Sequence, residues 1–557
     1  MCGILVHNFD CVVHSPLFHR GPDSSGYVKI KDWQMHHSRL SIQDTRDAAG
    51  QPFSTRNGTY LLYNGEIYNH KELRSKYFST IEFKTTGDTE LLYHVLISER
   101  YDLLDKIEGI FAFVFYNNNQ IIYARDPFGV KPLFKYDNNK NFALGSELEI
   151  FFQLTSLKVN DSYLPELIKY RYIGLDNTIY KNVSKVLPGR IYIKDEFGVS
   201  EKTYTTVFDN IDKDLPVDDD EILFDLKSTV ESQLIADVEV GLLLSGGIDS
   251  TLISKFVPKN TKTFSSIFFK DFKFDESKYI DTVQQKYGLQ NTKIPFTKSY
   301  YENNLSPSFF RRGGVSLNHV IALEQIAQEA SRHVKVLLSG EGADEIFLGY
   351  NRYQEINDLN DIIVNEQYLH NDEAITFFNW SENEENIANN SRIKFLSDSN
   401  KSVKGNLQML EVNFHLSFLL QRLDYTLMKY SVEGRVPFLG QSFAKKMFGI
   451  KYQKLMGDPG SYSNYKAKLP LKKLVSKEFG DEFAFRRKIG YITPFFVWMY
   501  SDFCYNLIVS IIKTSDIVNT YIQKIHLDDI CNRTGVYNTY MYQKLFWSIL
   551  NLKSLEV

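Results

Sequence analysis

Short apolar segments alternate with Asn, Asp and Gly through residues 1 to about 205. Because these three residue types favour turns, the apolar segments between them are predicted to be strands. Strands are expected at 26–30, 60–63, 111–116, 120–124 and 190–194, and a helix is expected around 89–99. The pattern predicts an N-terminal part built of sheets with a few helices.

A polar and acidic stretch, FDNIDKDLPVDDDE at 208–221, interrupts this pattern. We interpret it as a linker between two domains, residues 2–205 and 220–557, with a solvated loop inside one domain as the alternative. Beyond it, helical periodicity at 222–235 and from 251 onward alternates with apolar runs at 238–244 and 335–338. Apolar strands that alternate with helices predict a parallel α/β sheet covered on both faces.

The last two hundred residues show a mostly helical pattern that begins near residue 357. Within it, residues 381–406 are rich in Asn, Ser, Glu and Lys and are predicted to be a mobile excursion.

Composition and charge restrict the class of protein. Lys and Arg number 64 and Asp and Glu 68 in 557 residues, which argues against a generally basic nucleic-acid binder. The sequence has no apolar run of roughly 18 to 20 residues and no signal-like N-terminus, so neither a membrane span nor secretion is expected. Four cysteines are too few for a disulfide framework. These features predict a cytoplasmic protein, and the oligomeric state stays open, with a homodimer as one option.

The apolar run before residue 245 leads into SGGIDS at 245–250. Glycines allow a sharp turn close to a ligand, and the free N–H groups of the following helix attract an anion. Ser245 and Ser250 add hydroxyl donors, whereas Asp249 would repel an anion unless a divalent cation lies between them. An ordinary Gly-Gly turn with a helix cap is the alternative.

A second loop, SGEGADE at 339–345, follows the apolar run that ends at residue 338. Ligands of open α/β sheets bind at the carboxyl ends of strands, so both loops are expected to converge on one nucleotide. Glu341 can act as a base and Asp344 as a metal ligand, unless the loop is only a solvated acidic turn. The basic run RRK at 486–488 is either a solvated charge cluster or the source of a lysine, Lys488, that stabilises charge on phosphoryl oxygens.

Cys2 follows Met1 directly and becomes the first residue if Met1 is removed. A free N-terminal Cys carries its own base, because its α-amino group has a pKa of about 7.7 to 8.0 in model peptides. Taken alone, Cys2 is an ordinary second residue. Five further motifs follow it in order: HRGPD at 19–23, HSRLSI at 37–42, YNGEIYN at 63–69, GDTE at 87–90 and RDPFGVKP at 125–132. Locally, Asn64-Gly65 suits a hairpin turn and Asp88 a helix N-cap.

Together these motifs resemble the glutaminase domain of class II glutamine amidotransferases, whose N-terminal Cys is the nucleophile. SGGIDS resembles the pyrophosphate loop of ATP-pyrophosphatases, and nearly the whole chain is similar to glutamine-hydrolysing asparagine synthetases. The resemblance implies an α/β multi-domain fold. Its N-terminal part would be an Ntn-hydrolase-like αββα sandwich. Its C-terminal part would be an α/β parallel-sheet ATP-pyrophosphatase domain with a largely helical C-terminal region.

The resemblance also implies a role for each matching residue. In the glutaminase, Cys2 would attack glutamine, Asn64 and Gly65 would form the oxyanion hole, and glutamine would be bound by Arg39, Ile42, Asn64, Glu66 and Asp88. In the synthetase, ATP would be bound by Leu243, Ser245, Gly246, Gly247, Asp249, Ser250, Ser266, Ser339 and Gly340. Asp249 and Asp344 would bind Mg²⁺, Glu341 would serve the ammonia step, and Lys488 would stabilise the adenylated intermediate.

Three departures from the family pattern leave the acceptor open. Tyr425 and Gly440 stand where relatives often have Arg and Asp, and RRGGVSLNHV at 311–320 does not match the stretch that grips the acceptor carboxylate in relatives. The expected partners are therefore glutamine, ATP and a carboxylate acceptor. Aspartate is favoured, and a uronic acid or a peptide carboxylate is the alternative. A non-catalytic binding relative is a third hypothesis, which the intact motifs disfavour.

Overall fold

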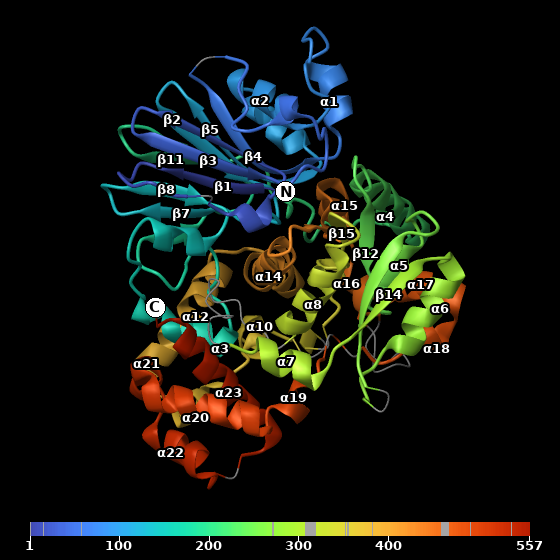
Figure 1. The fold of residues 1–557 in the computed structure, drawn as a ribbon. Coiled ribbons are helices and arrows are strands. Elements are labelled where there is room, and N and C mark those ends of the chain that lie inside the picture. The colour runs from blue at the N-terminus through green and yellow to red at the C-terminus, as the bar shows by residue number, and fades with distance from the viewer. Residues whose placement is uncertain are drawn as a thin grey trace.

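Two antiparallel sheets face each other in the N-terminal part of the chain (Figure 1). The computed structural model describes every residue except 1, 15, 57, 270–271, 307–318, 351, 354–355, 381, 458–466, 489, 491, 536 and 557. The six-stranded sheet has the order β2 (Ser24–Ile30), β3 (Trp33–Arg39), β1 (Cys2–His7), β8 (Phe142–Gly145), β7 (Phe134–Asp137), β9 (Val183–Lys185). The five-stranded sheet has the order β11 (Val199–Thr203), β10 (Arg190–Lys194), β6 (Gln120–Arg125), β5 (Gly109–Asn117), β4 (Tyr60–Ile67).

Helices cover the outer face of both sheets. Along β1, Ile4 and Val6 point into the core between the sheets, whereas Leu5 points outward, as the alternation of side chains in a strand requires. α1 (His70–Tyr77) and α2 (Thr89–Ile97) cover the five-stranded sheet, and α3 (Leu164–Tyr170) lies in the same outer core as Leu5. The predicted αββα sandwich is confirmed, and the five strands predicted in this part all lie within observed ones.

The third sheet is parallel throughout and lies in the C-terminal part. Its order is β14 (Gln290–Pro295), β13 (Lys262–Ile267), β12 (Val240–Leu243), β15 (Val336–Leu338), β16 (Glu433–Arg435). The helices that precede or alternate with its first strands along the chain are α4 (Asp219–Gln233), α5 (Ile248–Ser254), α6 (Ser277–Tyr287), α7 (Lys298–Asn304) and α8 (Val320–Ala330). β12 pairs directly with β15, so the loops 245–250 and 339–345 emerge side by side.

The rest of the chain is mostly helical, as predicted. It comprises α9 (Ala343–Ile346), α10 (Leu359–Glu366), α11 (Asn371–Phe377), α12 (Glu382–Ser397), α13 (Val403–Leu410), a π-helical turn (Glu411–Leu416), α14 (Ser417–Met428), α15 (Gln441–Met447), α16 (Tyr452–Met456), α17 (Leu469–Phe479), α18 (Asp481–Ala484), α19 (Phe495–Trp498), α20 (Asp502–Thr514), α21 (Asp516–Tyr521), α22 (Lys524–Asn532) and α23 (Thr539–Ser554).

The predicted mobile excursion at 381–406 is wrong, because most of that segment forms α12 and the start of α13. Although the segment is polar, it contains one fully buried residue, Arg392, whose guanidinium contacts Glu166 at 2.7 Å and Glu366 at 2.6 Å. The guanidinium also lies 3.4 Å from the centre of the Tyr170 ring. A buried ion pair with residues distant in sequence therefore orders a segment that composition alone marks as solvated.

Charged side chains are buried where the N-terminal and C-terminal parts meet. Arg20 is fully buried and contacts both Glu147 and Asp424 at 2.8 Å. Lys131 donates to the Gly434 carbonyl at 3.1 Å across the same boundary. The stretch 208–218 packs against the C-terminal part and is not a free linker, since the Leu215 N–H donates to the Gly449 carbonyl.

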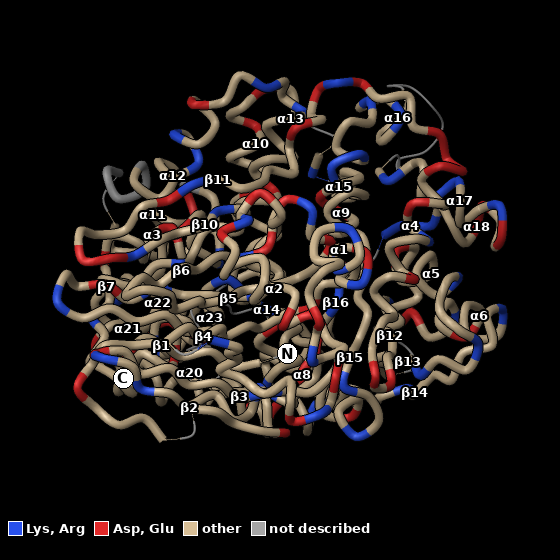
Figure 2. Tube along the Cα trace, turned by 90° about the horizontal axis from the view of Figure 1, so that it is seen from above, with Lys and Arg blue, Asp and Glu red and all other residues tan. Residues whose placement is uncertain are grey.

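Charges of both signs are interspersed around the periphery of the trace (Figure 2). Within the described residues, no helix combines the length and the apolar character that a bilayer crossing needs.

We expect Arg20→Ala to destabilise the protein strongly, because it leaves two carboxylates buried without their cation. Breaking a buried ion pair in this way costs about 3–5 kcal/mol. Thermal unfolding followed by circular dichroism should show a clear decrease in Tm. Arg190→Ala is the matched control, because Arg190 pairs with Glu201 on the surface, where such a pair contributes at most about 1 kcal/mol. Equal Tm values for the two variants would contradict a stabilising role for Arg20 at the boundary.

Candidate functional site

Cys2 begins β1 and is 5% exposed. In the strand register it lies opposite Arg39, the last residue of β3. The Cys2 N–H donates to Asn64 Oδ1 at 2.9 Å, and Asn64 belongs to β4 of the facing sheet. The start of β1 is therefore held between the two sheets, at the boundary with the C-terminal part (Figure 1).

Asn64 and Gly65 lie inside β4, so the hairpin turn that their sequence suggests is wrong. Asn64 is fully buried, and its Nδ2 has no hydrogen-bond partner among the described residues. Gly65 is required by packing, since a Cβ there would lie 2.2 Å from the Ile110 carbonyl oxygen. The geometry thus leaves a buried amide donor beside Cys2.

Arg39 organises the loop that follows β3. Its guanidinium donates to the carbonyl oxygens of Asp44 at 2.5 Å and Arg46 at 3.0 Å. Ile42, in the same loop, accepts a hydrogen bond from the Asp237 N–H at 2.9 Å. The loop is therefore held by Arg39 on one side and by the C-terminal part on the other.

Asp88 and Glu66 complete this first cluster. Asp88 occupies the N-cap position of α2, as predicted, but its side chain makes no cap hydrogen bond there. Its Oδ2 instead accepts from the Tyr63 hydroxyl and the Ile67 N–H, both at 2.7 Å. Burial, with Asp88 and Glu433 nearby, raises the pKa of Glu66 well above its usual range. The structure thus brings together all the residues predicted for the glutaminase.

A cavity of about 480 Å³ opens at the carboxyl ends of β12 and β15. The nucleotide and synthetase residues predicted from sequence line it, with one exception: Leu243, Ser245, Gly247, Asp249, Ser250, Ser266, Ser339, Gly340, Glu341, Asp344 and Lys488. Gly246 is the exception. It adopts φ 76°, in the left-handed region that favours glycine, and so allows the loop to turn.

The polar groups of the first loop are already arranged around the turn. The hydroxyls of Ser245 and Ser250 lie 3.1 Å apart, and the Gly247 N–H donates to Ser245 Oγ at 3.2 Å. Ser266, from β13, is different: its Oγ is buried without a hydrogen-bond partner among the described residues. Ser266 therefore offers a hydroxyl to a ligand of this cavity.

Lys468 bridges the two predicted metal ligands, and no sequence motif pointed to it. Its Nζ lies 2.6 Å from Asp249 Oδ2 and 2.9 Å from Asp344 Oδ1. Lys488 also contacts Asp344. Gly349 allows this arrangement, because a Cβ there would lie 2.0 Å from Asp344 Oδ1. Carboxylate oxygens are the ligands that Mg²⁺ prefers, so the chemistry of Asp249 and Asp344 fits the predicted ion, while the two lysines supply the positive charge beside them here.

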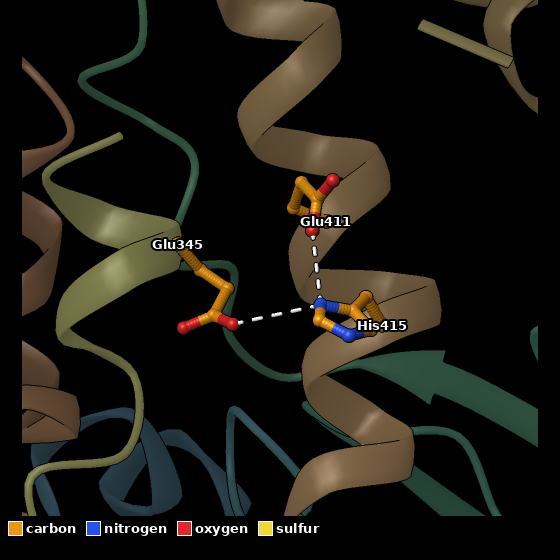
Figure 3. Close-up of side chains that lie close together, drawn as sticks. All are labelled: Glu345, Glu411 and His415. Carbon is orange, nitrogen blue, oxygen red and sulfur yellow. Dashed lines mark ion pairs between the residues drawn. The ribbon is translucent and has the colours of Figure 1, made fainter. Parts of the chain in front are cut away.

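The wall of the cavity also includes a network of acids and bases. Glu341 contacts Arg422, which also donates to His319 Nε2 at 2.5 Å. In Figure 3, His415 lies between Glu411 at 3.2 Å and Glu345 at 3.8 Å. The π-helical turn carries both Glu411 and His415, and such turns are frequent at functional sites.

We interpret the group in Figure 3 as an ion-pair network rather than a metal centre. Arg352 donates to both Glu411 oxygens at 2.7 Å and lies 3.3 Å from His415 Nδ1, so a guanidinium already supplies the positive charge. Although burial opposes ionisation, Arg352 and His415 lower the pKa of Glu411 to about 2. Burial and nearby Asp344 raise the pKa of Glu345 to about 8, which keeps Glu345 protonated at neutral pH.

Two departures from the family pattern have a packing reason. The Tyr425 hydroxyl accepts a hydrogen bond from the Leu148 N–H at 2.9 Å, across the boundary between the parts. A Cβ at Gly440 would lie 2.5 Å from Thr229 Cγ2, so no larger residue fits there. Of the third departure, residues 311–318 lie outside the described residues, as do 489 and 491 beside Lys488 and Met1 before Cys2.

Comparison with known proteins matches both parts of the chain. Residues 1–205 match the glutamine amidotransferase domain family, and residues 222–555 match the asparagine synthase family. The chain is 33% identical to asparagine synthetase [glutamine-hydrolyzing] 1 of Bacillus subtilis over 61% of this chain and 55% of that protein. It is 26% identical to asparagine synthetase [glutamine-hydrolyzing] 3 of the same organism over 85% and 82%.

A relative with another name is similar over a comparable stretch. Amidase chyE of Penicillium rubens is 26% identical over 63% of this chain and 55% of that protein. In two of these three comparisons the chain thus spans little more than half the length of the relative. Because the asparagine synthase match covers more than half of the chain, the protein belongs to the asparagine synthase family and carries an N-terminal glutamine amidotransferase domain.

Proposed function

We propose that the protein is an ATP-dependent amidotransferase that uses glutamine as its nitrogen donor. Glutamine and water give glutamate and ammonia at the first cluster. ATP and a carboxylate acceptor give an acyl adenylate and pyrophosphate in the cavity. Ammonia then displaces AMP and forms the amide. Aspartate is the favoured acceptor, which makes the product asparagine, and another carboxylate acceptor is the second candidate.

The glutamine step is assigned to the residues around Cys2. Once Met1 is removed, the Cys2 α-amino group takes the thiol proton and the sulfur attacks the carboxamide carbon. Asn64 Nδ2, which has no hydrogen-bond partner among the described residues, and the N–H of Gly65 stabilise the oxyanion, for which one donor contributes about 2.7–4 kcal/mol. Arg39 with Asp88 and Glu66 suits the zwitterionic end of glutamine.

The ATP step is assigned to the cavity. The loop at 245–250 binds the phosphates through its N–H groups and hydroxyls, while Leu243 and Ser266 contact the adenosine. Asp249 and Asp344 would hold Mg²⁺, which neutralises phosphate charge when bound. Lys488 stabilises negative charge on the adenylate, and Glu341 accepts a proton in the ammonia step.

The observation that supports coupling of the two steps is that one buried arginine contacts both sites. Arg435 Nη2 lies 3.8 Å from Glu66 Oε1 in the first cluster. The backbone oxygen of the same residue accepts from the Ser339 N–H, in the second nucleotide loop, at 2.8 Å. Two sites built on one strand residue suit a reaction in which ammonia from the first is consumed at the second.

Cys2→Ala is expected to abolish the use of glutamine while leaving activity with added ammonium, because only the first site is damaged. Asp249→Ala should abolish both activities, because it removes a phosphate-site carboxylate. AMP release and amide formation measured with glutamine and with ammonium chloride separate the two variants. Loss of the ammonium-dependent activity in Cys2→Ala would contradict the assignment of two separate sites.

The product identifies the acceptor. Incubation with ATP, Mg²⁺, amide-¹⁵N glutamine and a panel of carboxylates should place ¹⁵N in an amide, with aspartate giving labelled asparagine by mass spectrometry. Labelled amide on another panel member, without asparagine, would favour the second candidate. Intact mass is the control: retained Met1 would leave the glutaminase inactive, because the α-amino group would not belong to Cys2.

The affinity for ATP is expected to decrease above about pH 8. Lys472 lines the cavity, and burial, together with Lys468 and Lys488, lowers its pKa to about 8. Lys472 is charged below that pH and neutral above it, so the phosphates lose one favourable charge as the pH rises. Between pH 7 and 9 the KM for ATP should rise roughly three- to tenfold.

Lys472→Met should raise the KM for ATP at pH 7 and remove this pH dependence. Lys473→Met is the matched control, because Lys473 is the next residue of α17 and is exposed outside the cavity. A wild-type KM that stays constant from pH 7 to 9 would show that Lys472 does not contribute charge to ATP binding.

A further inference from the structure

The loop that follows β3 packs against the C-terminal part of the chain. Leu40 and Ile42 of this loop are buried in one apolar cluster with Val336, the first residue of β15, and Met428, the last residue of α14. Apolar packing is not directional, so it does not by itself decide how the loop is oriented. The orientation depends on the hydrogen bonds that the loop makes.

Asp237 of the C-terminal part binds the loop on both sides of Gln43. Its backbone N–H donates to the Ile42 carbonyl at 2.9 Å, and its Oδ2 accepts from the Asp44 N–H at 2.8 Å. Asp44 is buried, and a buried N–H group without an acceptor costs free energy. The two hydrogen bonds therefore hold residues 42–44 in one conformation.

The Asp44 carbonyl connects this loop to a predicted glutamine-binding residue. It accepts from the Arg39 guanidinium at 2.5 Å, and the side chain of Gln43 contacts that of Glu66. The resemblance assigns glutamine binding to Arg39, Ile42 and Glu66. A displacement of the loop would therefore change the surroundings of all three residues.

The segment that carries Asp237 is itself held in place. It connects α4 to β12, and the buried Arg435 donates to the carbonyl oxygens of Gln233 at 2.7 Å and Ile235 at 2.8 Å. The acceptor for the Asp44 N–H is thus fixed by the C-terminal part.

An ordinary surface role does not account for these contacts. Asp237 is exposed, and an exposed carboxylate is most often only solvated. Glu239, two residues further along, is also exposed and pairs with Lys262 of its own part at 2.7 Å. Asp237 differs from Glu239 because its carboxylate accepts from a residue of the N-terminal part.

We propose that Asp237 is a positioning residue for glutamine: its carboxylate fixes the loop 42–44 and, through Asp44, orients the guanidinium of Arg39. The inference rests on the proposed function, in which Arg39 and Ile42 bind the nitrogen donor. An arginine that holds a carboxylate through two hydrogen bonds tolerates little misplacement. The glutamine site is then complete only with a residue of the synthetase part.

The first test measures glutamate release and amide formation. Asp237→Ala should raise the KM for glutamine roughly 3- to 10-fold, because one hydrogen bond to the loop is lost. The KM values for ATP and for ammonium should stay unchanged, since Asp237 does not line the cavity. Asp237→Asn should keep the KM for glutamine close to that of the wild type, because the amide oxygen can replace the carboxylate as acceptor.

The second test measures glutamine binding without turnover. Glutamine should protect the Cys2 thiol from alkylation by iodoacetamide, followed by peptide mass mapping. Asp237→Ala should need roughly 3- to 10-fold more glutamine for half protection. The alkylation rate without glutamine should equal that of the wild type, because Asp237 acts on the loop and not on the thiol.

Glu239→Ala is the matched control. It removes an exposed carboxylate from the same segment, but one that pairs within the C-terminal part. This variant should keep the wild-type KM for glutamine and the wild-type protection of Cys2.

Three results would overturn the proposal: an unchanged KM and unchanged protection in Asp237→Ala, an equal rise of the ammonium and ATP KM values in that variant, or an Asp237→Asn variant that behaves like Asp237→Ala. Glutamate release by the wild type tests the proposed function separately. If the wild type released none, protection of Cys2 by glutamine would still test Asp237, since protection requires binding but no turnover.

Discussion

Buried charges at the boundary between the two parts constrain the rest of the structure. Arg20 and Arg435 are fully buried, and each lies near a carboxylate of its own part and one of the other. Removing a charge from water costs several kcal/mol unless a partner meets it with good geometry. A shifted boundary would leave these charges buried and unpaired. The ion pairs therefore specify one docked arrangement of the two parts.

This arrangement determines how the two sites are related. β16 is only three residues long, yet its side chains and backbone reach both sites. Arg435 faces Glu66 on one side and accepts from the Ser339 N–H on the other, while Lys131 donates to the neighbouring Gly434 carbonyl. The position of the second nucleotide loop and that of a predicted glutamine-binding carboxylate thus depend on the same strand.

The electrostatics of the cavity follow from the same pairing of buried charges. Lys468 holds Asp249 and Asp344 close together, which places two carboxylates at one point beside the phosphate loop. Elsewhere in the cavity, Arg352 and Arg422 are each paired with a carboxylate. The charges that line the cavity are therefore arranged largely as ion pairs.

The sequence determined the classes of element and the residues whose chemistry depends on local order. Glycine-containing loops after apolar strands, a cysteine at the start of a strand and alternating apolar residues are local patterns. They predicted sheets with a few helices in the N-terminal part and the parallel sheet in the C-terminal part. The resemblance to a known family implied the αββα sandwich and the predicted residues that line the cavity. Local patterns gave wrong predictions where a contact with a distant residue decided the structure. Asn64-Gly65 lies in a strand and not in a turn, the Asp88 side chain accepts from the Tyr63 hydroxyl and does not cap α2, and the buried ion pairs of Arg392 order α12.

Only the tertiary structure decided which charges meet. Lys468 carries no motif, since an isolated basic residue is most often a solvated one, and no local pattern gives Arg435 its contacts. Each acquires its role because a segment far away in sequence places a carboxylate or an N–H group against it. The free energy of such a contact depends on burial and distance, and neither is encoded in the spacing of residues along the chain.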